Sequence, residues 1–249
     1  MRWLVLLLLM ALPAKAEEVV AGLSQNRVAI STNFDGSEIL IFGAVRREAA
    51  IPDDPLHVII AVSGPSAPVV VRKKDRRFGI WINTEAVEVD EAPSFYAVAT
   101  SAPWTEAIRE VEDLRHKVSV VRAIRSVGAP PGIVDAERFT DALIRIRESL
   151  DLYQTQIGAV DLSEDTLFRT SISLPANLTE GDYTARFFLT RDGVVVDTHE
   201  EVIRVQKVGL ERFLYALAHE QPLVYGLLSL AIAIAAGWGA SAAFRYVRG

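Results

Sequence analysis

The densest charge in the sequence is a run of five cations within six positions. The five are Arg72, Lys73, Lys74, Arg76 and Arg77, interrupted only by Asp75, and we call them the basic cluster. Side chains of this kind bind anions, so the cluster could contact lipid phosphates, an acidic loop of a partner or a small anion. The alternative, which we regard as the commoner use of such charges, is a solvated strand edge protected from pairing with other strands.

An aromatic ring and an amide follow the basic cluster. If residues 78–82 form a strand, Trp81 and Asn83 share one face with Gly79. An aromatic side chain beside an amide is typical of a cleft that binds a small ligand. A tryptophan of a β-sandwich more often lies in the core, however, and a core position is the interpretation that we favour for Trp81.

Small residues repeat at every fourth position near the C-terminus. They are Ala231, Ala235, Gly239 and Ala243. In a helix these residues share one face that is almost free of side chains, and in lipid such a face allows two helices to pack closely. The repeat predicts a docking face for an integral membrane protein or for a second copy of the chain. The alternative is a plain anchor that is rich in alanine.

Other residues give little sign of catalysis or metal binding. The absence of cysteine excludes disulfides, thiol nucleophiles and thiolate ligands. The four histidines are scattered, and the single cluster, His199-Glu200-Glu201, offers too few ligands at metal-binding spacing. We therefore expect no catalytic, cofactor-binding or metal-binding residues and no enzymatic activity. A hydrolase assembled from distant residues is the least favoured alternative.

An apolar run without charges occupies residues 223–244 and is followed by Arg245 and Arg248. At about 1.5 Å per residue it gives a helix of roughly 33 Å, which is enough to cross a hydrocarbon core of about 30 Å. We predict a transmembrane helix at residues 222–246, after a juxtamembrane helix at 208–221 and before a cytoplasmic stub at 247–249.

The N-terminus predicts the orientation of that helix. Arg2, an apolar stretch at residues 3–12 and the small-residue exit at 13–16 together resemble a cleavable secretory signal over residues 1–16. The arginines that follow the apolar run favour the cytoplasmic side. We therefore expect a single-pass protein of the cytoplasmic (inner) membrane, with a periplasmic main domain and a cytoplasmic C-terminus.

The residues between these two segments are expected to be mainly β. Short runs of β-branched and aromatic residues fill residues 19–101 and resume after Gly158, and between them Phe139, Leu143 and Ile146 repeat at helical spacing. We predict an Ig-like β-sandwich over residues 17–207 with a helical insertion at about 103–156. Two small domains are the alternative.

The charge balance of this exported part excludes one class of partner. All 32 acidic residues but only 22 of the 26 basic residues lie between Glu17 and Glu220, so this stretch has a net charge of −10. A nucleic-acid-binding protein normally presents a basic surface. We therefore expect no nucleic acid partner.

Several short runs resemble one known family. The runs are at residues 78–83, 93–98, 167–169, 174–177, 181–183 and 191–193, with Gly237-Trp238 and Phe244-Arg245 near the C-terminus. In combination they resemble the putative transmembrane protein family of alphaproteobacteria. The resemblance implies an exported module on one C-terminal span, of no established activity. It also suggests a sulfite or anion exporter of the TauE type as partner.

These observations favour one function over another. The first is a membrane-anchored periplasmic interaction module that docks to an integral membrane protein such as an anion exporter, using the small-residue face and the basic cluster. The second is a periplasmic protein that binds or senses a small ligand near Trp81 and Asn83. Self-association through the membrane span is a further option.

Overall fold

The computed structural model describes residues 17–31, 34–48, 51–52, 54–127, 135–208 and 210–248. The predicted signal sequence at residues 1–16 lies outside them. The described chain divides into two compact units, one formed by residues up to Val28 and from Phe34 to Val205, the other by residues 29–33 and 206–249. The chain is mainly β with one apolar C-terminal helix, so the predicted fold class is confirmed at this level.

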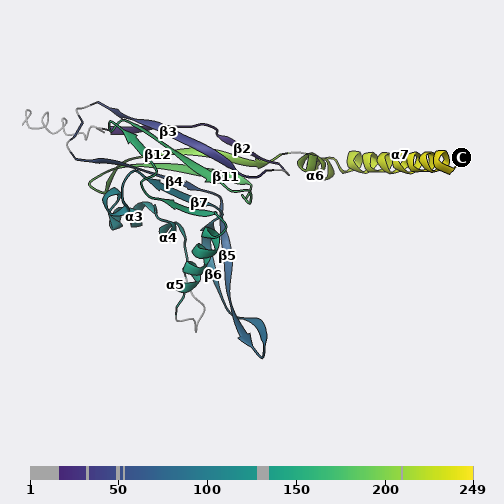
Figure 1. The fold of residues 1–249 in the computed structure, drawn as a ribbon, viewed down its shortest axis with the longest axis horizontal. Helices are drawn as coiled ribbons and strands as arrows, with labels where there is room; N and C mark the ends of the chain where they lie inside the picture. The colour runs from purple at the N-terminus through teal and green to yellow at the C-terminus, as the bar shows by residue number, and fades with distance from the viewer. Residues whose placement is uncertain are drawn as a thin grey trace, which may run out of the picture. The chain divides into compact units, whose positions relative to one another are not determined.

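Two sheets form the body of the first unit (Figure 1). The four-stranded sheet has the order β1 (Glu17–Leu23), β3 (Ser37–Arg47), β10 (Leu167–Leu174) and β9 (Asp161–Ser163). Its residues alternate between core and solvent: Ile39 and Ile41 are buried, whereas Leu40 and Phe42 are exposed. This period of two places one face of the sheet against the core.

The larger sheet has six strands. Their order is β2 (Arg27–Ile30), β12 (Val194–Lys207), β11 (Gly181–Arg191), β4 (Leu56–Ser63), β7 (Tyr96–Thr100) and β8 (Tyr153–Gln156). Adjacent residues of β11 point to opposite faces of the sheet. The Phe187 ring packs against Phe168 of the other sheet, with ring centroids 6.1 Å apart, and the Phe188 ring packs against His116, with centroids 5.8 Å apart. One face therefore packs against the four-stranded sheet and the other against helices. The Ig-like assignment stays a prediction.

The described residues between β7 and β8 form four helices. They are α2 (Trp104–Ala107), α3 (Glu110–His116), α4 (Val120–Ala123) and α5 (Glu137–Glu148). Side chains of the six-stranded sheet hold this segment: the Tyr96 hydroxyl donates to the Val118 carbonyl at 2.7 Å, and the Arg186 guanidinium donates to the His116 carbonyl at 2.7 Å. The described part of the segment predicted as a helical insertion thus contains these four separate helices, while β8 at its end joins the sheet in parallel with β7.

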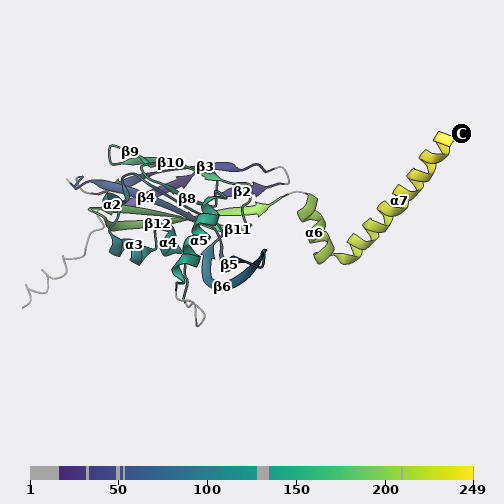
Figure 2. The same ribbon diagram turned by 60° about the horizontal axis from the view of Figure 1, so that its bottom comes forward.

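A long hairpin leaves this body between β4 and β7. It consists of β5 (Ser66–Arg77) and β6 (Ile80–Pro93), which pair with each other as a separate two-stranded sheet. We call this hairpin the arm. Figures 1 and 2 show the arm running away from the two sheets, with α5 beside its base.

The second unit contains the helices α6 (Leu210–Glu220) and α7 (Pro222–Arg248). Among the described residues α7 is the one helix long and apolar enough to cross a membrane, with residues 222–241 as its candidate span. The side chains of that span are exposed to the surroundings, which suits contact with lipid and does not suit the core of a soluble domain.

Candidate functional site

The arm has two halves with different surroundings. In the base, Val87 and Val89 are fully buried and belong to the same core cluster as Phe139 of α5. The pairing register then shifts between Lys73, which faces Glu85, and Lys74, which faces Asn83. From that bulge to the turn, residues 74–83 are all exposed. The outer half therefore contributes nothing to the core and is free to contact another molecule.

The turn at the end of the arm has an unusual residue. Phe78 and Gly79 form a two-residue loop with φ of 52° and 86°. Positive φ at both positions is the geometry that matches the twist of a hairpin, and asparagine followed by glycine is the preferred pair. A phenylalanine in this region is strained. Its side chain is 106% exposed, so no packing in the described structure offsets that strain.

Large apolar side chains gather at the same end. Ile80 is 64% exposed and Trp81 is 68% exposed, and Ile82 is exposed next to them. We call Phe78, Ile80, Trp81 and Ile82 the apolar tip. The predicted core position of Trp81 is therefore wrong, because the arm has already left the core at the bulge. Trp81 and Asn83 lie on a two-stranded ribbon, and a ligand site around them stays a prediction.

The basic cluster lies on β5 immediately behind the apolar tip. Lys73 Nζ is 3.2 Å from a carboxylate oxygen of Glu85, and Arg77 Nε is 3.7 Å from one of Asp75. Both pairs are exposed, and pairs of this kind contribute little to stability. Within the part of the chain that the structure describes, Arg72 and Lys74 form no ion pair. The cluster therefore has most of its charge available to an external anion.

A groove of about 520 Å³ lies between the base of the arm and α5. Its lining residues are Val71, Arg72, Lys73, Glu85, Asp135, Arg138, Phe139, Ala142, Arg145 and Ile146. Apolar groups from Phe139 and Ile146 meet cations from both elements. This groove offers a small amphiphilic anion a concave surface with apolar and cationic groups.

The predicted docking face lies on α7. Ala231, Ala235 and Gly239 are exposed, and a Cβ added at Gly239 would meet no other atom within 4 Å. Position 243 belongs to the helix, but the Ala243 side chain lies outside the described side chains. The face is therefore open along the length of helix that can be described, and it shares no element with the arm.

Comparison with known proteins identifies the family at this point. The model of the family described as "Putative transmembrane protein (Alph_Pro_TM)" matches residues 18–246. The chain belongs to this family. Together with α7, this makes the chain a membrane-anchored protein with one candidate C-terminal span. The family description states no molecular function.

The other comparisons add little. No curated protein matches the chain. Among solved structures, the sporulation control protein Spo0M from Bacillus subtilis is similar at 11% identity, over 81% of this chain and 54% of its own, with a TM-score of 0.28. This chain thus spans about half the length of that protein, and so low a score supports no argument about fold or function.

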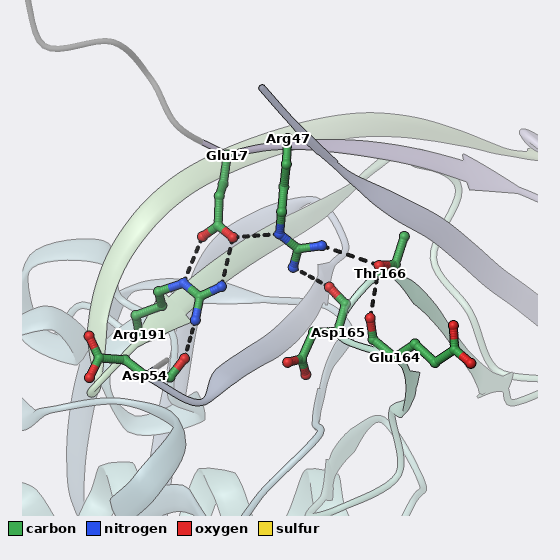
Figure 3. A network of polar contacts seen from close by, with 7 residues as sticks. All are labelled: Glu17, Arg47, Asp54, Glu164, Asp165, Thr166 and Arg191. Atoms are coloured by element: carbon green, nitrogen blue, oxygen red, sulfur yellow. Dashed lines mark hydrogen bonds and ion pairs between the residues drawn. The ribbon is translucent and has the colours of Figure 1, made fainter. Parts of the chain in front are cut away.

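A buried ionic network at the first described strand was not predicted. Glu17 is 7% exposed and accepts hydrogen bonds from Arg47 at 2.7 Å and from Arg191 at 2.7 and 2.8 Å (Figure 3). The same two guanidinium groups donate to the backbone carbonyls of Asp165 and Asp54. The hydrogen bond from Arg191 lowers the pKa of Glu17. The network joins β1, β3 and β11, which indicates a structural role.

Buried phenols have a similar structural role. Burial raises the pKa of both Tyr96 and Tyr153 to about 12, so each hydroxyl stays protonated and serves as a donor. Tyr153 donates to the Pro93 carbonyl at 2.8 Å. Among the described residues no group of three or more His, Cys, Asp or Glu side chains could hold a metal ion. In the cluster at His199, the imidazole Nε2 lies 3.2 Å from a carboxylate oxygen of Glu201, and the ring packs against Phe187 with centroids 5.9 Å apart.

Proposed function

We propose that this chain is a non-enzymatic accessory module that is anchored in the inner membrane, has its main domain in the periplasm and docks to an integral membrane protein. The observation that carries the proposal is α7, whose candidate span is exposed with an open face at Ala231, Ala235 and Gly239. The arm is a second contact surface, because its outer half exposes large apolar side chains that no other part of the described chain covers. An exposed apolar surface of this kind usually marks an interaction site. The arm is the contact surface of the exported domain, and α7 is its anchor.

In the proposal, α7 also meets the partner within the bilayer. Association of helices in lipid depends on close backbone packing, which Ala231, Ala235 and Gly239 permit. An exporter of the TauE type is the partner that the family resemblance suggests, and a second copy of the chain could occupy the same face.

The test is site-specific crosslinking in membranes of the native cell. A photoreactive residue at position 239 is expected to form an adduct with an integral membrane protein. The same residue at position 237 is the matched control, since that glycine lies on the opposite side of the helix. An adduct of the chain with itself would mean homo-oligomerisation, and equal labelling at the two positions would contradict a specific docking face.

The groove supports a second candidate function, the binding of a small amphiphilic anion. Its apolar lining at Phe139 and Ile146 faces Arg72 and Arg145, so an anion with a short apolar tail would satisfy both. A fatty acid of intermediate length is a suitable probe. It should raise the melting temperature of the full chain in detergent. The rise should be smaller for Arg145→Gln than for Arg169→Gln on β10, and equal rises would contradict binding in the groove.

A further inference from the structure

Charge is distributed unevenly along the arm. Residues 72–83 contain the basic cluster and a single carboxylate, Asp75, whereas residues 84–93 contain four carboxylates and no cation. Residues 72–83 thus have a net charge of +4 within a stretch, Glu17 to Glu220, that otherwise carries −14. Near an anionic surface such a distribution attracts the end of the arm and repels the body. The arm would meet that surface end-on.

The apolar tip presents large side chains on both faces of the ribbon. Trp81 lies opposite Arg76 in the pairing register, and the next pair, Ile80 with Arg77, points to the other face. Each face therefore has one large apolar group near the turn with an arginine beside it. A groove on a protein would cover one face and leave the other in water. A lipid layer that surrounds the tip would cover both faces of the ribbon.

The spacing of these groups fits the edge of a bilayer. At about 3.3 Å per residue, Arg76 and Arg77 stand roughly 3–7 Å behind the turn. The headgroup layer on each side of a bilayer is about 5–8 Å thick, so the two guanidinium groups would reach phosphates while Phe78 enters the acyl boundary. Tryptophan prefers this interface, and clustered Lys and Arg favour anionic lipids.

From these observations we propose that the apolar tip inserts into the interface of a bilayer containing anionic phospholipids, with Arg76 and Arg77 at the lipid phosphates and the rest of the basic cluster attracted by the negative surface. The inference deepens the proposed function, and rests on it only in that α7 anchors the chain in a membrane. That anchor ties the chain to a membrane and so raises the local concentration of lipid around it. Shallow insertion of one tip therefore needs little intrinsic affinity to be populated.

The experiment measures the contact between tip and lipid in the full chain. Because the sequence has no cysteine, Phe78→Cys can be labelled uniquely with an environment-sensitive fluorophore. Leu167→Cys is the matched control, since Leu167 is also exposed and lies on β10, away from the arm. Each protein is placed in nanodiscs containing about one third phosphatidylglycerol. Spin-labelled lipid, which quenches fluorophores at the acyl boundary, is added either to the same disc or to separate vesicles.

We expect quenching at position 78 to be at least threefold stronger than at position 167 when the spin-labelled lipid is either in the same disc or in separate vesicles. Whichever of the two gives this quenching identifies the bilayer that the tip enters. Quenching should fall to the control level in discs of neutral lipid and when the five cations of the basic cluster are replaced by Gln. The proposal is overturned if neither lipid source quenches position 78 more strongly than position 167. It is also overturned if the variant with Gln in place of the five cations is quenched as strongly as the original.

Contact with a protein is distinguished in the same system. A blue shift at position 78 that requires native membrane proteins and shows no quenching by lipid would mean a protein partner, and would overturn lipid insertion. The variants are first compared by circular dichroism, because a misfolded arm would give the same loss. Failure of the crosslink at position 239 would overturn docking through α7 and leave the quenching result unaffected, so the two proposals fail separately.

Discussion

At the scale of single residues, two positions have conformations or environments that are unfavourable for the residue found there. Phe78 keeps a positive φ with its ring in solvent, and Glu17 is buried between two guanidinium groups. The positive φ of Phe78 destabilises the turn of the arm. The buried carboxylate of Glu17 is tolerated only because both guanidinium groups pair with it. Each gives a test that does not require knowledge of the partner.

Replacing Phe78 with Asn should stabilise the outer half of the arm, because Asn tolerates the left-handed region that Phe occupies under strain. We expect hydrogen exchange at the amides of residues 74–83 to slow by about threefold, equivalent to roughly 0.7 kcal/mol. Phe78→Leu keeps the strain and should leave exchange unchanged.

Replacing Glu17 with Gln should change how stability depends on pH. The pKa of Glu17 is lowered in the folded chain, chiefly by its hydrogen bond with Arg191, so its contribution is complete above the unfolded pKa and is lost as the pH falls through the lowered folded pKa. At neutral pH the variant should lose about 3 kcal/mol of the free energy of unfolding, because two buried cations lose their carboxylate.

Urea unfolding from pH 7 to pH 3 measures this effect. The wild-type protein should lose more stability over that range than Glu17→Gln. Glu18→Gln is the matched control, since Glu18 pairs with Arg46 in an exposed position. Parallel curves for wild type and Glu17→Gln would contradict a role for the carboxylate.

At the scale of elements, the arm combines a core strand pair with a free ribbon, and the bulge at Lys73/Lys74 is the boundary. A bulge increases the local twist and ends the regular alternation of faces. On the core side of the bulge, Val87 and Val89 are part of the packing between the arm and α5. Beyond it, the strands are held by their mutual hydrogen bonds alone.

Shortening the arm should therefore leave the fold intact. If residues 74–83 are replaced by an Asn-Gly turn, the melting temperature should change by no more than about 2 °C, because no buried side chain is removed. Val87→Ala should cost about 2 kcal/mol, because it opens a cavity in the core. Calorimetry of the full chain in detergent compares the two, and a large loss from the shortened arm would contradict the division into halves.

At the scale of the whole molecule, one apolar helix, α7, is the candidate membrane anchor of the chain. A single span fixes the side of the membrane on which the rest of the chain lies, so the orientation can be tested with one label. We expect Leu167→Cys to react with a membrane-impermeant maleimide in intact spheroplasts and the chain to resist carbonate extraction. Removal of residues 222–249 should release the protein. A cysteine that reacts only after the membrane is lysed would contradict the periplasmic orientation.

Some features of this protein depend on local sequence alone. The apolar run of α7 depends on length and composition, so its bounds were predicted closely, whereas short-range alternation predicted the mainly β class without the bounds of every strand. The basic cluster is visible as a run of charges. The residues of the docking face follow from helical spacing, because the period of a helix is the same wherever the helix lies.

Only the tertiary structure decided where these elements stand relative to a core. The sequence around Trp81 has the alternation of a buried strand, yet the register shift at Lys73/Lys74 takes it out of the core. The Glu17 network joins residues more than 170 positions apart, and β8 pairs with β7 although its segment was predicted as helical. Burial and pairing depend on contacts between distant residues, which local periodicity cannot specify, because the same alternation suits a strand in the core and a ribbon in solvent.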